Sequence, residues 1–292
     1  MARKKNKSMK WQVETMLLSK LCIGQSRHEA KKYAKENGDT TPNGIYSWST
    51  YNTYKKHCIY FAQWAKETHQ CKTLDEAFPY VQEYIDFRVT QGLSAWTVKT
   101  EASAIAKMYG NQAKEWKLDT PARKRKDIRR SRLSCEHDKH ISVDKHNDII
   151  MFCKGSGLRR HELAALCTED IIVEGEIVYI QILQGKGGKQ RTVQVLPKYK
   201  DFIGSLSSDK ERQPVFDKIP QNLDIHSFRA DFACQWYKVL ARPLDSLASN
   251  QKYYCKGDRK GVVYDRKAMM TVSKLLGHNR INVIASNYLW KL

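Results

Sequence analysis

The sequence predicts a mainly α-helical fold with one small antiparallel β-sheet, an α+β class, divided between a helical domain and a mixed domain. Apolar residues recur three and four positions apart over long stretches, as they do on the buried face of a helix. A short region of the second half instead carries apolar runs separated by turn residues, which is typical of β-hairpins. With 292 residues, 41% of them hydrophobic, the chain is long enough to bury two separate cores.

We expect residues 1–45 to form a basic N-terminal extension with short helices rather than an independent domain. The opening MARKKNKSMKW is basic and lacks the apolar stretch of a secretory signal. Ser26 and Glu29 have the spacing of a capping box, so a helix that carries His28 to Tyr33 is expected to begin there.

Residues 46–119 are predicted to form a small helical bundle. One helix presents an apolar stripe: Tyr51, Tyr54, Cys58, Phe61 and Ala65. The same spacing continues in a second helix: Val81, Tyr84, Ile85 and Arg88. Gly92 ends that segment, and Ser94 can cap a third helix whose inner face includes Trp96 and Ile105. We interpret these aromatic residues as core rather than as platforms for stacked bases.

The segment TPARKRKDIRRSRLS, residues 120–134, is predicted to be a basic linker. Seven of its fifteen residues are Lys or Arg. Such a run is often only a solvated hinge, but it can equally lie along a phosphate backbone.

Residues 135–292 are predicted to combine helices with a three-stranded antiparallel sheet. IIVEGEIVYIQIL contains two apolar runs that meet at Glu174 and Gly175, and a glycine-rich loop then leads to a third run, RTVQVL. Helices are expected to follow at 226–241, 268–276 and 281–290.

The charge of the chain favours a polyanionic partner. Fifty-one Lys and Arg face thirty-one Asp and Glu, which leaves +20 and a pI near 9.5. An excess of this size favours nucleic acid. The sequence contains no long apolar run that would favour a membrane as the partner. None of the eight cysteines belongs to a CxxC pair, so we expect no zinc ribbon or redox motif and assign the chain to a reducing cytoplasm.

Two stretches contain cations beside glycines. In GSGLRRHELAAL, Arg159 and Glu162 lie three apart at the start of a helix, where backbone N–H groups can bind phosphate. In LQGKGGKQRTV, the glycines around Lys186 allow its side chain to reach a ligand. A solvated hairpin tip is the alternative for this loop, and it is our interpretation of Lys189 and Arg191.

Two further stretches contain histidines close to an arginine or a tyrosine. In LDIHSFRADFACQWY, His226 and Arg229 lie three apart near the start of a helix whose buried face carries Phe228, Phe232 and Trp236. An isolated histidine there is most often a satisfied structural residue, but beside an arginine it can transfer a proton to a phosphodiester. In LLGHNRINVIASNYLWKL, Gly277 ends one helix, His278 follows, and Tyr288 lies on the next helix. A tyrosine hydroxyl is a weak nucleophile unless neighbouring cations favour its phenolate.

The order of these stretches resembles the tyrosine recombinases, the phage-type integrases and Xer-like site-specific recombinases. GLRxxEL is followed by a lysine in a glycine-rich hairpin, then HxxR, then LGH, then a tyrosine. The resemblance implies that 135–292 is a catalytic domain, and the LSxxTV segment makes 46–119 resemble the core-binding domain of that family.

The resemblance also implies a role for each residue. Arg159 and Arg229 would bind the scissile phosphate, and Lys186 would protonate the departing 5′ oxygen. His226 would assist proton transfer, and His278 would hydrogen-bond a nonbridging oxygen. Tyr288 would attack the phosphorus to give a 3′-phosphotyrosyl link.

Neighbouring positions complete this interpretation. Glu162 would orient the arginine rather than react, and the GLR alignment favours Arg159 over Arg160 as the phosphate-binding residue. Ala230 and Trp290 differ from the residues that many members have at these positions.

The implied activity is site-specific recombination or integration for a mobile genetic element, on double-stranded DNA, by a homotetramer. Accessory DNA-bending or directionality proteins are further partners that the family allows. We expect no metal and no cofactor, because no Asp/Glu cluster indicates magnesium and no Walker motif indicates ATP. Two alternatives remain open: a type IB topoisomerase, which would relax any supercoiled DNA, and a catalytically inactive DNA-binding regulator.

Overall fold

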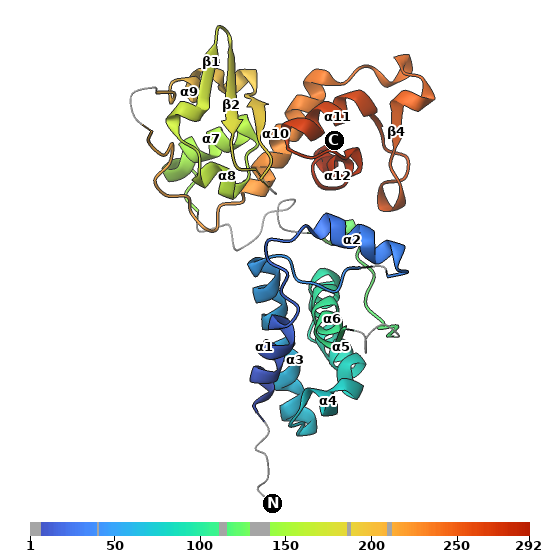
Figure 1. Ribbon diagram of the computed structural model, residues 1–292. Coiled ribbons are helices and arrows are strands. Elements are labelled where there is room, and N and C mark those ends of the chain that lie inside the picture. The colour runs from blue at the N-terminus through green and yellow to red at the C-terminus, as the bar shows by residue number, and fades with distance from the viewer. Residues whose placement is uncertain (1–6, 40, 111–115, 129–140, 186–187, 209–211) are drawn as a thin grey trace, which may run out of the picture. The chain divides into compact units, whose positions relative to one another are not determined.

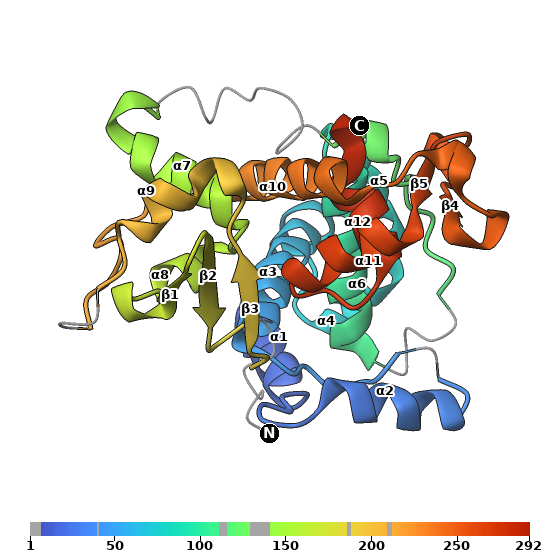
Figure 2. The same ribbon diagram turned by 90° about the horizontal axis from the view of Figure 1, so that it is seen from above.

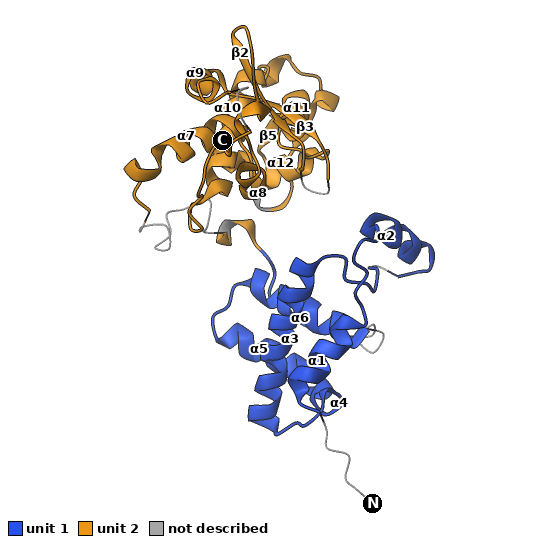
Figure 3. Ribbon diagram, turned by 60° about the vertical axis from the view of Figure 1, so that its left-hand side comes forward, with its two compact units in different colours: residues 1–123 blue, residues 124–292 orange. Residues whose placement is uncertain are grey.

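The structure, a computed structural model, describes residues 7–39, 41–110, 116–128, 141–185, 188–208 and 212–292. The chain divides into two compact units, residues 1–123 and 124–292 (Figure 3). Each unit buries a hydrophobic core of its own. No helix in the described ranges is both long enough and apolar enough to cross a membrane.

The described part of the first unit is built from helices and their connections, as predicted. Its helices are α1 Met9–Leu18, α2 Arg27–Glu36, α3 Trp48–His69, α4 Leu74–Ala77, α5 Val81–Thr90 and α6 Ala95–Tyr109 (Figure 1). The stripe predicted for α3 is confirmed, since Tyr51, Cys58, Phe61 and Ala65 are buried and Tyr54 packs against the same core. Buried residues of α1, α5 and α6 complete that core.

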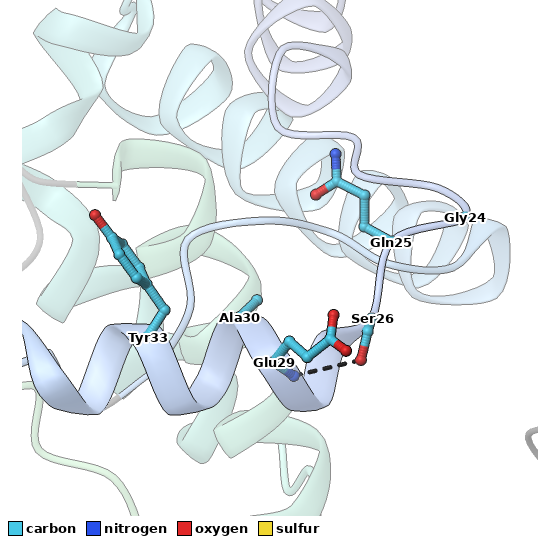
Figure 4. A pocket seen from close by; sticks show the side chains of 6 residues that line it. All are labelled: Gly24, Gln25, Ser26, Glu29, Ala30 and Tyr33. Atoms are coloured by element: carbon cyan, nitrogen blue, oxygen red, sulfur yellow. Dashed lines mark hydrogen bonds between the residues drawn. The ribbon is translucent and has the colours of Figure 1, made fainter.

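Serine caps begin four of these helices, α1, α2, α3 and α6. Ser94 accepts a hydrogen bond from the Thr97 N–H at the start of α6, as predicted, and Ser47 caps α3 in the same way. At the start of α2, Ser26 Oγ accepts from the Glu29 N–H at 3.3 Å (Figure 4). These bonds satisfy donors that the first turn of a helix leaves without partners.

A buried carboxylate joins three helices of the first unit. Glu101 of α6 is fully buried and accepts hydrogen bonds from Arg88 of α5 at 2.9 and 3.0 Å. His57 Nδ1 of α3 lies 3.1 Å from the same carboxylate. Arg88, which was predicted on the inner face of its helix, therefore does face inward. It forms an ion pair with Glu101 and does not serve as an apolar packing residue.

The chain leaves the first unit along its surface. Trp116 packs on Phe78 and Tyr109, and the Asp119 N–H donates to Gln82 at 2.9 Å. The predicted linker 120–134 lies partly outside the described residues, from 129 onward. Within the second unit, Arg125 donates to the Ser286 carbonyl at 3.0 Å.

In its described residues, the second unit combines helices with two small antiparallel sheets. Its helices are α7 Asn147–Ser156, α8 Arg160–Ala164, α9 Lys200–Gly204, α10 Ile225–Leu240, α11 Arg266–Leu275 and α12 Ile281–Asn287. The predicted sheet is confirmed as β1 Ile171–Glu174, β2 Ile177–Ile182 and β3 Arg191–Gln194, in that order. A second pair, β4 Lys252–Tyr254 and β5 Val263–Asp265, was not predicted.

Helix α10 is central to the second unit. It packs against α7 on one side and against α11 on the other (Figure 2). Phe232 and Trp236 are buried in the core, as predicted, while Phe228 is partly buried. Arg229 lies on the same helix and is also buried, so the buried face of α10 includes a charged side chain.

Candidate active site

The candidate site is built around the C-terminal end of α11. The His278 N–H donates to the Ser273 carbonyl at 2.7 Å, and the Gly277 N–H donates to Lys274 at 2.8 Å. Gly277 has φ +64°, so these bonds form a Schellman motif, which ends a helix on a left-handed residue. The predicted end of the helix at Gly277 is confirmed, and the turn brings His278 back beside the helix end.

Three arginines from three other elements donate to the last carbonyls of α11. Arg159 Nη2 donates to Leu276 at 3.0 Å, and Arg229 Nη2 donates to the same oxygen. Arg191 Nε donates to Leu275 at 3.1 Å. A helix C-terminus leaves carbonyls without intrahelical partners and carries a partial negative charge, so it stabilises cations gathered there.

Glu162 joins two of these arginines. Its carboxylate accepts from the Arg159 backbone N–H at 2.8 Å and from Arg159 Nη1 at 2.7 Å. Arg191 donates two further bonds, of 2.8 and 2.7 Å. Burial alone would raise the pKa of Glu162, but the hydrogen bonds and charges of Arg191 and Arg159 lower it to about 2. Glu162 is therefore an ionised support for both guanidiniums.

The interpretation of Arg191 as a solvated residue at a hairpin tip was wrong. Its side chain is 11% exposed and is held between Glu162 and α11. Strand alternation could have revealed this, because Arg191 lies on the same face of its strand as the buried Val193 and Val195.

Arg229 is 1% exposed and reaches three acceptors. It donates to the carbonyls of Gly157 and Leu276, and its Nε donates to the Tyr288 hydroxyl at 3.3 Å. Burial lowers the pKa of Arg229 to about 10, and the nearby Arg159 contributes in the same direction. The guanidinium is therefore charged at neutral pH.

Tyr288 lies at the centre of these groups. The residue is 4% exposed and follows α12 directly. Its hydroxyl lies 3.3 Å from Arg229 Nε and 3.2 Å from His278 Nε2, which in turn lies 3.4 Å from Arg159 Nη2. The rings of His226 and Tyr288 lie 5.3 Å apart between centroids, with His226 on the solvent side.

Four of the six predicted site residues are thus linked by direct contacts: Arg159, Arg229, His278 and Tyr288. His226 lies beside them, and Lys186 lies outside the described residues. Arg160 donates instead to the carbonyls of Pro220 and Leu223, at 2.8 and 2.6 Å, which anchors a loop.

The backbone around Tyr288 is held by groups from distant parts of the unit. Arg259 Nη1 donates to the carbonyls of Ala285 and Leu289, at 3.1 and 3.2 Å. The Tyr264 hydroxyl donates to Leu289 at 2.8 Å. Sequence reasoning missed both residues, since the turn and strand that carry them, at 257–265, were not predicted.

Chemically, the site contains a phenol, two imidazoles and three guanidiniums. In the part of the chain that the structure describes, no group of three or more His, Cys, Asp or Glu side chains could hold a metal ion. An arrangement of fixed cations around a phenol can bind an anion and stabilise a phenolate.

No protein-family model and no curated protein matches this chain in sequence. Among solved structures, it is similar to the XerH site-specific recombinase bound to difH substrate in a pre-cleavage complex. That alignment covers 96% of this chain and 93% of the other, with 15% identity and a TM-score of 0.53. An integrase of the Tn1549 transposon, in complex with circular intermediate DNA, aligns over 90% of this chain with 12% identity and a TM-score of 0.47. The chain shares the fold of the XerH recombinase.

Proposed function

We propose that this protein is a site-specific DNA recombinase, an integrase of a mobile element, that cuts and rejoins duplex DNA through a 3′-phosphotyrosyl intermediate. The observation that carries the proposal is the Tyr288 hydroxyl, which lies within 3.3 Å of both Arg229 and His278. The fold shared with the XerH recombinase supports it, and so does the +20 charge of the chain. We assign DNA gripping to residues 46–119 and chemistry to 135–292.

In this mechanism Arg159 and Arg229 bind the nonbridging oxygens of one phosphodiester. Arginine suits this task because its planar guanidinium donates several hydrogen bonds to one anion. His278 donates a further bond to a nonbridging oxygen. The charge that accumulates in the pentavalent transition state is then surrounded by fixed cations, which need no reorganisation during the reaction.

Tyr288 supplies the nucleophile. Its oxygen forms a bond to phosphorus while the bond to the 5′ oxygen breaks, and its proton leaves with the help of His226. Lys186 protonates the departing 5′ oxygen. The phosphotyrosyl ester conserves the energy of the broken bond, so a 5′ hydroxyl can reverse the attack and join a new strand without ATP.

Covalent trapping on a nicked recombination site tests the proposal. Wild-type protein should become attached to the 3′ end of the cleaved strand, and Tyr288→Phe should bind the same DNA without attachment. Equal attachment by the variant would remove Tyr288 from the mechanism.

A modified substrate tests Lys186 separately. Lys186→Met should cleave ordinary DNA slowly and should recover most of its rate when sulfur replaces the 5′ bridging oxygen, because a thiolate leaves without protonation. Failure of this rescue would contradict the general-acid role.

We further propose that four protomers assemble on DNA and exchange strands in pairs. Relaxation of any supercoiled plasmid, with no preferred sequence, would favour topoisomerase activity instead. A wild-type protein that never forms the covalent link on its own element's ends would be a regulator.

A further inference from the structure

Residues 22–39 and 41–44 belong to an excursion from the helical bundle of the first unit. The chain leaves and returns through a single bridge, in which Cys22 N–H donates to Ile45 at 2.9 Å and Ile45 N–H donates to Lys20 at 2.8 Å. Between these points the main element is α2, whose only buried residue is Ala34. Core packing therefore does not explain why the sequence forms this helix.

The charges of α2 are segregated. Five basic residues lie on one side, Arg27, His28, Lys31, Lys32 and Lys35, all exposed. At about 100° per residue they span an arc of roughly 140° that contains no acidic residue. We call this arc the α2 basic face.

The opposite side of α2 carries different residues. Glu29, Ala30 and Tyr33 line a shallow pocket, and their side chains leave the helix on the same side (Figure 4). Within the described residues, no ion pair joins the α2 basic face to a carboxylate.

More positive charge lies at the base of the excursion. Lys107 Nζ donates to the Pro42 carbonyl at 2.6 Å, and the pKa of Lys107 is lowered by burial and by the charges of Lys20 and Arg27. Like charges held together repel each other unless an anion compensates them. Among the residues that the structure describes, these cations are therefore concentrated without an ion pair to a carboxylate.

We infer that the α2 basic face binds the sugar-phosphate backbone of duplex DNA, independently of base sequence. This inference rests on the proposed function, because it adds a contact to the same DNA partner. Regularly spaced exposed cations on a rigid helix match a chain of phosphates, and neutralising phosphates releases counterions. The helix would position the DNA, while base reading would come from other elements.

The salt dependence of DNA binding by the full chain tests this inference. Lys31, Lys32 and Lys35 are changed together to Gln, which preserves helix propensity. On a duplex of random sequence, the slope of log Kobs against log salt should become shallower by about 2–3, since each phosphate contact contributes about 0.9. Affinity near 0.15 M salt should fall roughly 10- to 100-fold.

Two matched variants complete the experiment. A triple Lys→Gln change at exposed Lys198, Lys218 and Lys238 removes the same net charge from the second unit and should leave the slope within 0.5 of wild type (about half of one contact). Lys→Arg changes at the three α2 positions should retain the full slope.

An unchanged slope in the α2 variant, or an equal loss in the control, would overturn the inference. So would loss of binding to polyglutamate with DNA binding intact, because the face would then serve an acidic protein. Failure of the proposed function has a different signature: the α2 effect on binding persists while wild-type protein never attaches covalently to DNA.

A second inference concerns the segment that carries Tyr288. Helix α12 has seven residues and ends directly before Tyr288, so its last carbonyls need external donors. Arg259 supplies bonds to Ala285 and Leu289, and Arg125 supplies one to Ser286.

We propose that Arg259 is a positioning residue that holds the Tyr288 hydroxyl in line with Arg229 and His278. This also rests on the proposed function. A displacement of about 1 Å at a reacting group can slow a reaction on the order of 100-fold. Arg259 donates to one carbonyl before Tyr288, that of Ala285, and to one after it, that of Leu289. Its loss should therefore free the nucleophile to move without altering the protein surface that binds DNA.

Arg259→Met should slow covalent attachment roughly 10- to 100-fold at saturating DNA, with Kd unchanged, and speed hydrogen exchange at 285–292. Arg259→Lys should recover part of the rate. Lys260→Met, an exposed neighbour on the same hairpin, is the control and should match wild type. A normal attachment rate in Arg259→Met would refute the inference, whereas absence of attachment in wild type would instead refute the proposed function.

Discussion

Replacing Arg191 by methionine should destabilise the second unit, although sequence alone places this residue at a solvated hairpin. The arginine makes two charge-assisted bonds, of 2.8 and 2.7 Å, to a Glu162 carboxylate with no exposed surface. Removing one partner of a buried ion pair costs about 3–5 kcal/mol, because the remaining charge stays buried. Arg159 still contacts Glu162, so we expect about 3 kcal/mol.

Native-state hydrogen exchange is the suitable assay, since the two units can unfold separately and a single global transition cannot be assumed. The amides of α8 and α11 should lose about 3 kcal/mol of protection in Arg191→Met, whereas α3 and α6 should be unchanged. Glu162→Gln and the double variant complete a double-mutant cycle, in which we expect a coupling energy of about 2 kcal/mol between Arg191 and Glu162.

An exposed ion pair in the same unit provides the control. Arg212 and Glu169 are 3.1 Å apart, with side chains 60% and 41% exposed. Arg212→Met should cost less than about 0.5 kcal/mol, because solvent screens such pairs. If Arg191→Met cost no more than this control, the Glu162 network would not stabilise the site.

Three further outcomes are expected. The pKa of Glu162 is lowered from 4.5 to about 2, so its stabilising contribution is complete above pH 4.5 and is lost as the pH falls toward 2. Between pH 5 and pH 2, wild type should therefore lose about 3 kcal/mol more stability than Glu162→Gln. In urea unfolding, Gly157→Ala should lower stability by more than about 2 kcal/mol, because φ is +59° and the added Cβ would lie 2.4 Å from the ring of Phe232 in α10. Gly175→Ala, at φ +57° but in open space, should cost only about 1 kcal/mol. In covalent trapping, Arg160→Met should retain a rate within about threefold of wild type, while Arg159→Met should lose on the order of 100-fold or more, because Arg159 contacts His278 whereas Arg160 donates to loop carbonyls.

Local sequence signals predicted the elements that carry strong periodicity or clear caps. The α3 stripe, the Ser94 cap, the three-stranded sheet and the end of α11 at Gly277 all follow from short-range patterns. These features depend on residues a few positions apart, so neighbouring residues determine them.

Features that depend on distant contacts were not predicted. The β4 and β5 strands have three residues each, too short for a detectable alternation. The role of Arg191 depends on Glu162, 29 positions away, and on a carbonyl 84 positions away. The neighbouring sequence distinguishes such an arginine from a solvated one only by strand alternation, which places it on the inner face. That signal can be used only after the strand itself has been recognised.

The charges of the site suggest why three arginines can be held so close together. Arg159, Arg191 and Arg229 contribute three positive charges, and Glu162 with the C-terminal end of α11 returns about one and a half negative charges. Among these groups the remainder is roughly +1.5, which exceeds the single charge of a phosphodiester, and the protonated Lys186 of the proposed mechanism would add to it. If the site binds a phosphodiester, as proposed, it should hold that group more strongly as negative charge accumulates on it, which is the condition for lowering a barrier rather than only binding a substrate. The Leu276 carbonyl is central to this balance, because it accepts from both Arg159 and Arg229 and so fixes their separation without adding a second full negative charge.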